Sequence, residues 1–158
     1  MIRNKARLVA QGYSQMEGVN YDETFALVAR MESIRILLAL PCHLKFNLYQ
    51  IDIKTAFLNG LLKEDVYVAQ PKGFIDPHFP DLVLYLKKAL YGLKQAPRAW
   101  YDWLTQYLVS HEFTRGKAYQ NLFIIKEDNK LIVAQVYVDD IIFGSTKDEL
   151  AHSFSKLM

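Results

Sequence analysis

The feature that most constrains the fold of this chain is a long strand-forming run interrupted by two adjacent aspartates. Residues 131–143 read LIVAQVYVDDIIF, so Asp139 and Asp140 lie between two apolar segments. Two such segments around turn-forming residues predict a β-hairpin inside a sheet. Acidic side chains are rarely buried unless they are paired or bind a metal, and two neighbouring carboxylates repel by roughly 1 kcal/mol in water and several times more beside an apolar surface. The tip of this hairpin therefore needs either solvent or cations.

Two interpretations of the pair remain open from these residues. Aspartate is common in turns because its short side chain bonds the nearby backbone, so the pair could simply form an exposed hairpin tip. A second motif, YQIDIKTAF at 49–57, instead suggests a metal site, because Asp52 ends another largely apolar strand. If the sheet places Asp52 beside the hairpin, three carboxylates converge, and such oxygen ligands suit Mg²⁺ or Mn²⁺. Two such ions about 4 Å apart would support in-line phosphoryl transfer.

A third stretch, LKKALYGLKQAPRAWYDW at 86–103, interleaves cations with aromatic residues around a glycine. Its members are Lys87, Lys88, Lys94 and Arg98 together with Tyr91, Trp100 and Tyr101. Cations bind phosphates and aromatic rings stack on bases, so the stretch predicts a nucleic-acid track that includes Gln95. Trp100 and Trp103 also have the spacing of a helical core, and the lysines are equally compatible with a solvated face.

A fourth cluster lies near the start of the chain, where Arg3, Lys5 and Arg7 alternate along an expected strand. These cations could contact a triphosphate or a template backbone, or form a solvated strand face.

Composition narrows the class of protein only slightly. The 158 residues suffice for one domain with a core, and 19 basic against 17 acidic residues give a net charge of +2, which by itself indicates no nucleic-acid partner. A single cysteine, Cys42, excludes an internal disulfide, and the four histidines lack the spacing of a zinc site. The longest apolar run, residues 36–41, is far below the roughly 18–20 residues of a membrane span. We expect a soluble, intracellular protein without a membrane partner.

The order of elements predicts an α+β fold. We expect strands at 5–10, 46–53, 66–70 and 82–87, hairpins around 127–130 and 139–140, and helices at 31–44, after Pro97 and near the end of the chain. Pro41 should kink or end its helix. Both ends look cut, so we expect a piece of a longer protein.

Five motifs in this order resemble the reverse transcriptase domain of copia-class LTR retrotransposon polyproteins. They are KARLVAQGYSQ, YDETFALVARMESIRILLAL, QIDIKTAFLNGLLKEDVYVAQPKGF, KKALYGLKQAPRAWY and VYVDDIIFGS, and the resemblance runs from Lys5 to Phe154.

The resemblance implies a right-hand polymerase palm with partial fingers, built as an antiparallel sheet with packed helices. Residues 1–45 would be partial fingers and 46–158 mainly palm with an inserted fingers segment, while the thumb and RNase H would lie outside the chain. Asp52, Asp139 and Asp140 would be the catalytic carboxylates that hold two Mg²⁺ or Mn²⁺ ions.

The resemblance also implies a deoxynucleotide pocket. Phe57 would be the aromatic gate that excludes a ribose 2′-hydroxyl, Gln95 would line the pocket, and Lys5 or Arg7 would lie near the triphosphate of the incoming dNTP.

The implied function is RNA-directed DNA synthesis, with a primed RNA or DNA template, dNTPs and the remainder of the Pol polyprotein as partners. The parent element would act in a cytoplasmic virus-like particle, the nucleus or both. Two alternatives remain open: an inactive remnant that at most binds nucleic acid, and a metal-dependent nuclease that uses the same carboxylates.

Overall fold

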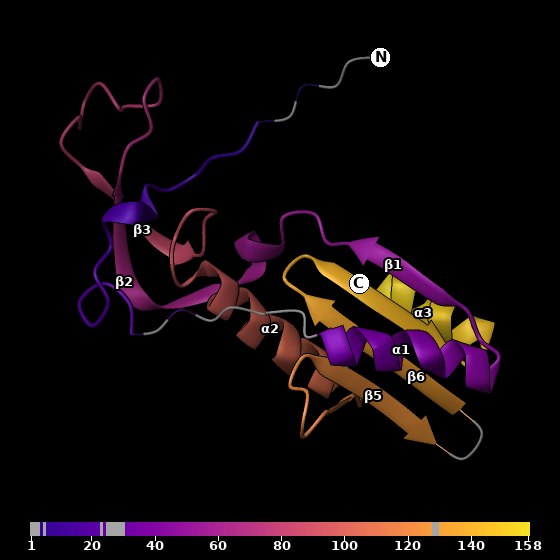
Figure 1. The fold of residues 1–158 in the computed structure, drawn as a ribbon. Helices are drawn as coiled ribbons and strands as arrows, with labels where there is room; N and C mark the ends of the chain where they lie inside the picture. Colours follow the sequence, from indigo (N-terminus) through magenta and orange to yellow (C-terminus); the bar gives the residue numbers. More distant parts are fainter. Residues whose placement is uncertain (1–3, 5, 23, 25–30, 128–129) are drawn as a thin grey trace. The chain divides into compact units, whose positions relative to one another are not determined.

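The computed structural model describes residues 4, 6–22, 24, 31–127 and 130–158 (Figure 1). Three α-helices are described in these ranges: α1 (Met31–Leu44), α2 (Ala96–Ser110) and α3 (Asp148–Leu157). The short helices are η1 (Gly12–Ser14) and η2 (Ala56–Asn59). The strands are β1 (Leu48–Asp52), β2 (Leu61–Ala69), β3 (Val83–Lys88), β4 (Thr114–Arg115), β5 (Leu122–Glu127), β6 (Lys130–Tyr137) and β7 (Asp140–Ser145). The predicted mixture of helices and antiparallel strands is confirmed.

The chain divides into two compact units, each built from two separate segments. Unit 1 comprises Met1–Phe25 and Phe57–Trp103, and unit 2 comprises Ala26–Ala56 and Leu104–Met158. No helix among the described residues is long and apolar enough to cross a bilayer.

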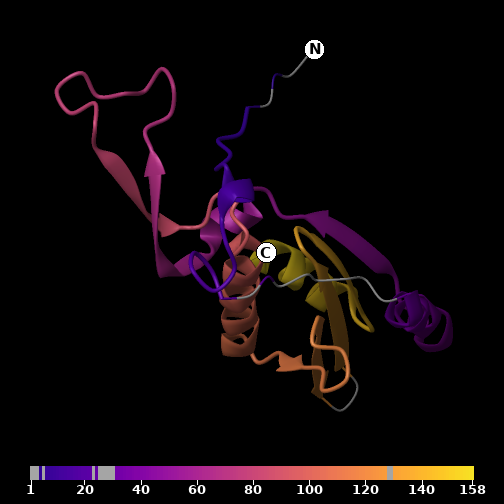
Figure 2. The same cartoon turned by 60° about the vertical axis from the view of Figure 1, so that its left-hand side comes forward.

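Unit 2 is built on an antiparallel sheet with strand order β1-β7-β6-β5-β4. Successive residues of a strand point to opposite faces, so the register assigns each helix to a face. Gln135 of β6 donates to Ser33 of α1, whereas Phe143 of β7 packs against Phe154 of α3 with 4.8 Å between ring centroids. Because Gln135 pairs with Ile142, Gln135 and Phe143 face opposite sides. Figures 1 and 2 accordingly show α1 and α3 on opposite sides of this sheet.

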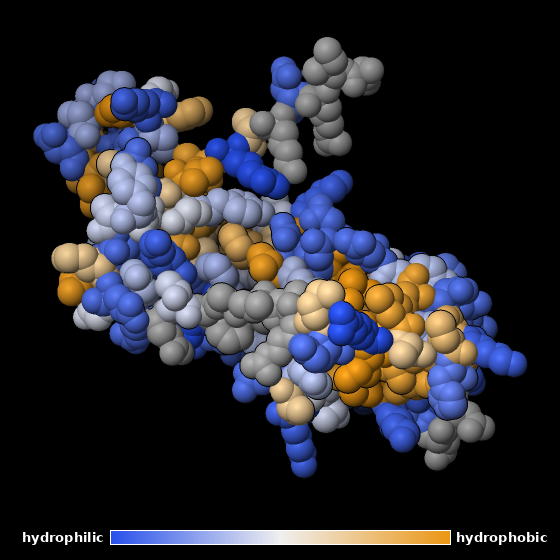
Figure 3. All heavy atoms as spheres, in the orientation of Figure 1, coloured by the Kyte–Doolittle hydropathy of each residue, from blue (hydrophilic) through white to orange (hydrophobic). Residues whose placement is uncertain are grey.

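Burial on both faces explains why β6 is an almost uninterrupted apolar strand, with residues 132–136 all buried. The outer surface of α1 is also apolar, and Figure 3 shows this patch over the helix. Met31, Ile36 and Leu38 are each more than half exposed there.

Unit 1 contains the β2–β3 hairpin and an apolar cluster of Val66, Ala89, Leu93 and Ala96. Trp100 of α2 is almost fully buried and stacks on Trp103 with 5.4 Å between centroids. The helical periodicity of the two tryptophans thus correctly indicated core packing.

One local prediction was wrong, and another was wrong in part. Residues 6–10 form no strand, and only Val9 makes an isolated bridge, to Tyr91. This segment meets the backbone of a turn rather than a second strand, so no ladder can extend. We expected Pro41 to kink or end its helix, and it does not end α1, which continues to Leu44. A proline removes only one helical hydrogen bond, and the buried Leu37 one turn earlier keeps this helix packed on its unit.

The loop between β2 and β3 is organised by the side chain of Gln70. Its Nε2 donates to the carbonyls of Phe79 (2.8 Å) and Leu82 (2.9 Å), and its Oε1 accepts from the N–H of Asp76 (2.8 Å). The same loop leaves Phe74 81% exposed. The half-buried Gln70 amide thus holds this exposed loop in a defined shape.

We expect Gln70→Ala to loosen this loop without unfolding the unit. The variant loses three hydrogen bonds, each worth roughly 0.5–1.5 kcal/mol, so chymotryptic cleavage at Phe74 and Phe79 should accelerate by about tenfold or more. Gln106→Ala, at an exposed position of α2, is the matched control. Equal cleavage rates for the two variants would show that Gln70 does not hold the loop.

Candidate active site

The candidate site begins at the turn that joins β6 to β7. Tyr137 pairs with Asp140, so Val138 and Asp139 form a two-residue loop. Val138 has a φ of +56°, a left-handed conformation that is unfavourable for a β-branched residue. Such strain costs about 1–3 kcal/mol and persists where the surrounding structure imposes it. The turn therefore holds Asp139 in a constrained position.

The sheet register brings Asp52 to this turn. Asp52 is the last residue of β1 and pairs directly with Asp140, so their side chains share one face of the sheet. The N–H of Ile53 donates to the carbonyl of Asp139 at 2.7 Å, which closes the end of β1 onto the turn. Asp52 is exposed, and Asp139 and Asp140 are half-buried. The acidic pair thus lies where the apolar strands reach solvent, together with a third carboxylate.

Gln50 is a site residue that sequence reasoning missed. Its Nε2 donates to Oδ1 of Asp140 at 3.0 Å and so orients that carboxylate. The available signal was its position two residues before Asp52, which places both side chains on one face of β1.

The donor set at this end of the sheet fits a hard divalent cation. Three carboxylates supply oxygen ligands of the kind that Mg²⁺ and Mn²⁺ prefer. Within the described part of the chain, no three His, Cys, Asp or Glu side chains are close enough together to hold a metal ion as they stand. Metal binding would therefore require these carboxylates to turn toward a common point.

A buried polar contact supports the strand that leads into the turn. Nε2 of Gln135 donates to Oγ of Ser33 at 2.8 Å, which ties α1 to β6. Two residues further on, burial raises the pKa of the Tyr137 phenol, and the nearby Ser33 hydroxyl partly opposes this shift. The phenol therefore stays protonated and uncharged beside the acidic turn at neutral pH.

The predicted nucleotide residues that the structure describes lie in unit 1. Phe57, in η2, is half-buried, and its ring lies 5.0 Å from that of Tyr91 between centroids. The guanidinium carbon of Arg7 lies 5.0 Å from the centroid of the same Tyr91 ring. Lys5 and Arg3 lie outside the described residues. Tyr91 thus contacts two residues that the resemblance assigns to the nucleotide pocket.

Gln95 lies in unit 1 as well, but it is only 2% exposed. Its Oε1 accepts from Nε2 of Gln15 at 3.1 Å, and Oε1 of Gln15 accepts from the N–H of Lys94 at 3.0 Å. Nε2 of Gln95 has no protein partner. Gln15 therefore orients the Gln95 amide and leaves its donors unused. No local pattern links two glutamines 80 residues apart.

We expect Gln15→Leu to destabilise the chain by about 1–3 kcal/mol, because it leaves the buried Oε1 of Gln95 without a partner. The double variant Gln15→Leu/Gln95→Met removes both polar groups and should cost less than the single variant. Urea unfolding curves would measure both effects. A single variant as stable as the parent chain would contradict the structural role of this pair.

The predicted nucleic-acid track is only partly accessible. Tyr101 is 3% exposed, and Trp100 is buried as well, so neither ring can stack on a base. The reason is that both belong to the inward face of α2. Lys87, Lys88 and Lys94 are exposed and remain candidates for phosphate contacts.

Comparison with known proteins identifies a matching family and several relatives. The family model described as "Reverse transcriptase (RNA-dependent DNA polymerase)" matches residues 1–158. The chain is 45% identical over 151 residues to the "Retrovirus-related Pol polyprotein from transposon RE1" of Arabidopsis thaliana, covering 96% of this chain and 10% of the relative. It is 39% identical over 153 residues to that from transposon TNT 1-94 of Nicotiana tabacum, covering 96% and 12%. The chain thus spans about a tenth of the length of these relatives, and no solved structure matches it.

Proposed function

Because the chain belongs to the reverse transcriptase (RNA-dependent DNA polymerase) family, we propose that it provides the catalytic carboxylates for DNA synthesis on an RNA template. The primer 3′-oxygen would attack the α-phosphorus of a dNTP, forming a phosphodiester bond and releasing pyrophosphate. The observation that carries this proposal is the register that pairs Asp52 with Asp140 beside Asp139.

Reverse transcriptases generally use divalent metal ions, and the oxygen donors of this site fit that chemistry. Asp52, Asp139 and Asp140 would hold two Mg²⁺ or Mn²⁺ ions. When bound, such ions lower the pKa of the attacking hydroxyl and stabilise the leaving pyrophosphate. Gln50 would hold Asp140 in the orientation that ligation requires, through its 3.0 Å hydrogen bond.

The substrate pocket is proposed from residues of unit 1. Phe57 would exclude a ribose 2′-hydroxyl, Arg7 would lie near the triphosphate, and Gln95 would line the pocket. The accessible lysines of the 87–94 stretch would contact the template–primer backbone. Such contacts position the nucleic acid but do not read its base sequence. The assignment of Lys5 to the triphosphate stays a prediction.

In the polymerase description, unit 2 would be the palm and unit 1 the fingers segment. The antiparallel sheet that carries the carboxylates supports the palm assignment. The boundary that we predict near residue 45 differs from the division into compact units, since α1 belongs to unit 2. The remaining parts of a Pol polyprotein are proposed partners, because the relatives are Pol polyproteins, and the proposed location is the intracellular particle or nucleus of the parent element.

Primer extension tests the proposal directly. The chain would be incubated with poly(rA)–oligo(dT), dTTP and either Mg²⁺ or Mn²⁺, and we expect metal-dependent lengthening of the primer. No extension by a chain with a folded circular-dichroism spectrum would favour an inactive remnant. Nucleotide release without incorporation would indicate a nuclease instead.

A further inference from the structure

We infer that Tyr91 is a positioning residue for deoxynucleotide selection, because its ring joins Phe57 to Arg7. The inference rests on the proposed function, since it concerns the same substrate pocket. It goes beyond that proposal by assigning sugar selectivity to a residue that would touch neither the sugar nor the phosphates.

The Tyr91 ring contacts two side chains that are assigned to the nucleotide pocket. Phe57 packs against it in a tilted arrangement, with 5.0 Å between centroids and 46° between ring planes. Arg7 lies 5.0 Å from the same centroid, within the range of a cation–π interaction. Phe57 is otherwise supported by the apolar cluster around Leu93. Tyr91 is therefore the aromatic contact that limits how far Phe57 can shift within unit 1.

The backbone of Tyr91 is itself held firmly, so its ring can act as a fixed support. The N–H of Ala10 donates to the carbonyl of Tyr91 at 2.7 Å, and Val9 forms a parallel bridge to the same residue. The next residue, Gly92, has a φ of +93°, and a Cβ there would collide with the carbonyl of Ala10. The chain around Ala10 and the turn at Gly92 thus pack backbone against backbone.

This arrangement predicts two separable effects of losing the ring. Phe57 would gain freedom to move away from the 2′ position, so discrimination against ribonucleotides would fall. Arg7, which is exposed and rests on the ring, would lose its orienting contact, so the KM for the nucleotide would rise. The Tyr91 hydroxyl contributes to neither contact.

The test compares Tyr91→Leu, Tyr91→Phe and Arg7→Gln with the parent chain in the extension assay, using dTTP and UTP separately. The loss of one contact between aromatic rings changes an equilibrium constant by about two- to tenfold. We therefore expect Tyr91→Leu to lower the dTTP-over-UTP preference by about two- to tenfold and to raise the KM for dTTP more than it lowers kcat. Tyr91→Phe should match the parent chain. Arg7→Gln should raise the KM for dTTP with the preference unchanged.

The outcomes separate this inference from the proposed function. An unchanged preference in Tyr91→Leu, with extension intact in the parent chain, overturns the inference alone. A parent chain that neither extends the primer nor binds dTTP by calorimetry overturns the proposed function and this inference with it. If Tyr91→Leu fails to fold, two other measurements test the inference. They are the NMR resonances of the Phe57 ring in Tyr91→Phe and the KM of Arg7→Gln for dTTP. Displaced Phe57 resonances in Tyr91→Phe, or a KM of Arg7→Gln equal to that of the parent chain, would contradict the proposed role of Tyr91.

Discussion

Replacing Asp139 by asparagine is expected to abolish metal-dependent primer extension. The substitution removes one charge from the turn while keeping the size of the side chain, and it exchanges a carboxylate ligand for a weaker amide oxygen. Charge stabilisation by a bound metal is worth several kcal/mol, so the rate should fall about a thousandfold or more. The strained turn at Val138 and the hydrogen bond from Ile53 to the Asp139 carbonyl involve the backbone and should persist.

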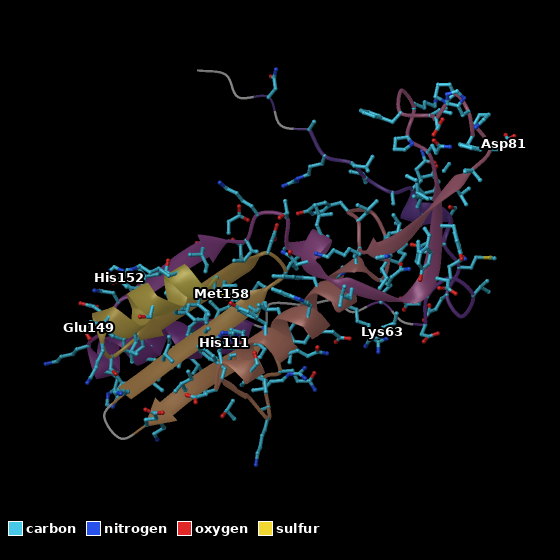
Figure 4. All side chains as sticks on the ribbon, turned by 180° about the vertical axis from the view of Figure 1, so that it is seen from behind. Lys63, Asp81, His111, Glu149, His152 and Met158 are labelled. Carbon is cyan, nitrogen blue, oxygen red and sulfur yellow. The ribbon has the colours of Figure 1, made fainter. Side chains whose placement is uncertain are left out.

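The control for this experiment is Asp81→Asn. Asp81 is an exposed carboxylate in the loop between β2 and β3, where Figure 4 labels it, and it undergoes the same chemical change. We expect this variant to extend the primer at the parental rate. If Asp139→Asn retains full activity, the carboxylate assignment fails. If the two variants lose activity equally, the loss reflects a general charge effect.

The second large effect is expected at Phe57. Shortening it to valine opens the space that its ring occupies, so UTP incorporation should increase while dTTP incorporation changes little. Discrimination by apolar shape is worth about ten- to a few hundredfold, and we expect the dTTP-over-UTP preference to fall by about a hundredfold. Single-turnover incorporation of each nucleotide would measure this ratio. The change should exceed that of Tyr91→Leu, because Phe57 would contact the sugar itself.

Phe74→Val is the matched control, since it makes the same replacement at a side chain exposed in the β2–β3 loop. Its preference should equal that of the parent chain. Because Phe57 is half-buried against an apolar cluster, thermal unfolding of Phe57→Val must also be recorded. A folded Phe57→Val chain that still rejects UTP would exclude Phe57 as the gate.

Local sequence patterns determined much of the fold of this protein. Three of its elements were predicted: the helix at Met31–Leu44, the helix expected after Pro97, which begins at Ala96, and the hairpin of β6 and β7. Periodicity and turn chemistry act between near neighbours in the chain, so local sequence is enough to indicate such elements. The resemblance in ordered motifs also indicated the family, which the match over residues 1–158 confirms. The same local reasoning failed at residues 5–10, where an alternating pattern looked like a strand but no strand partner lies alongside its described residues.

Only the tertiary structure decided which of these residues meet. Three contacts depend on how distant segments pack. They are the pairing of Asp52 with Asp140, the hydrogen bond from Gln50 to Asp140 across 90 residues, and the contacts of Arg7 and Phe57 with Tyr91. The register of a sheet is set by the burial of whole strands, and a slip of one residue would move Asp52 to the other face. Packing likewise buried Tyr101 and Gln95, whose residue types alone suggested exposed contacts. The sequence determined which chemical groups are present and where strands end, and long-range packing determined which groups share a site.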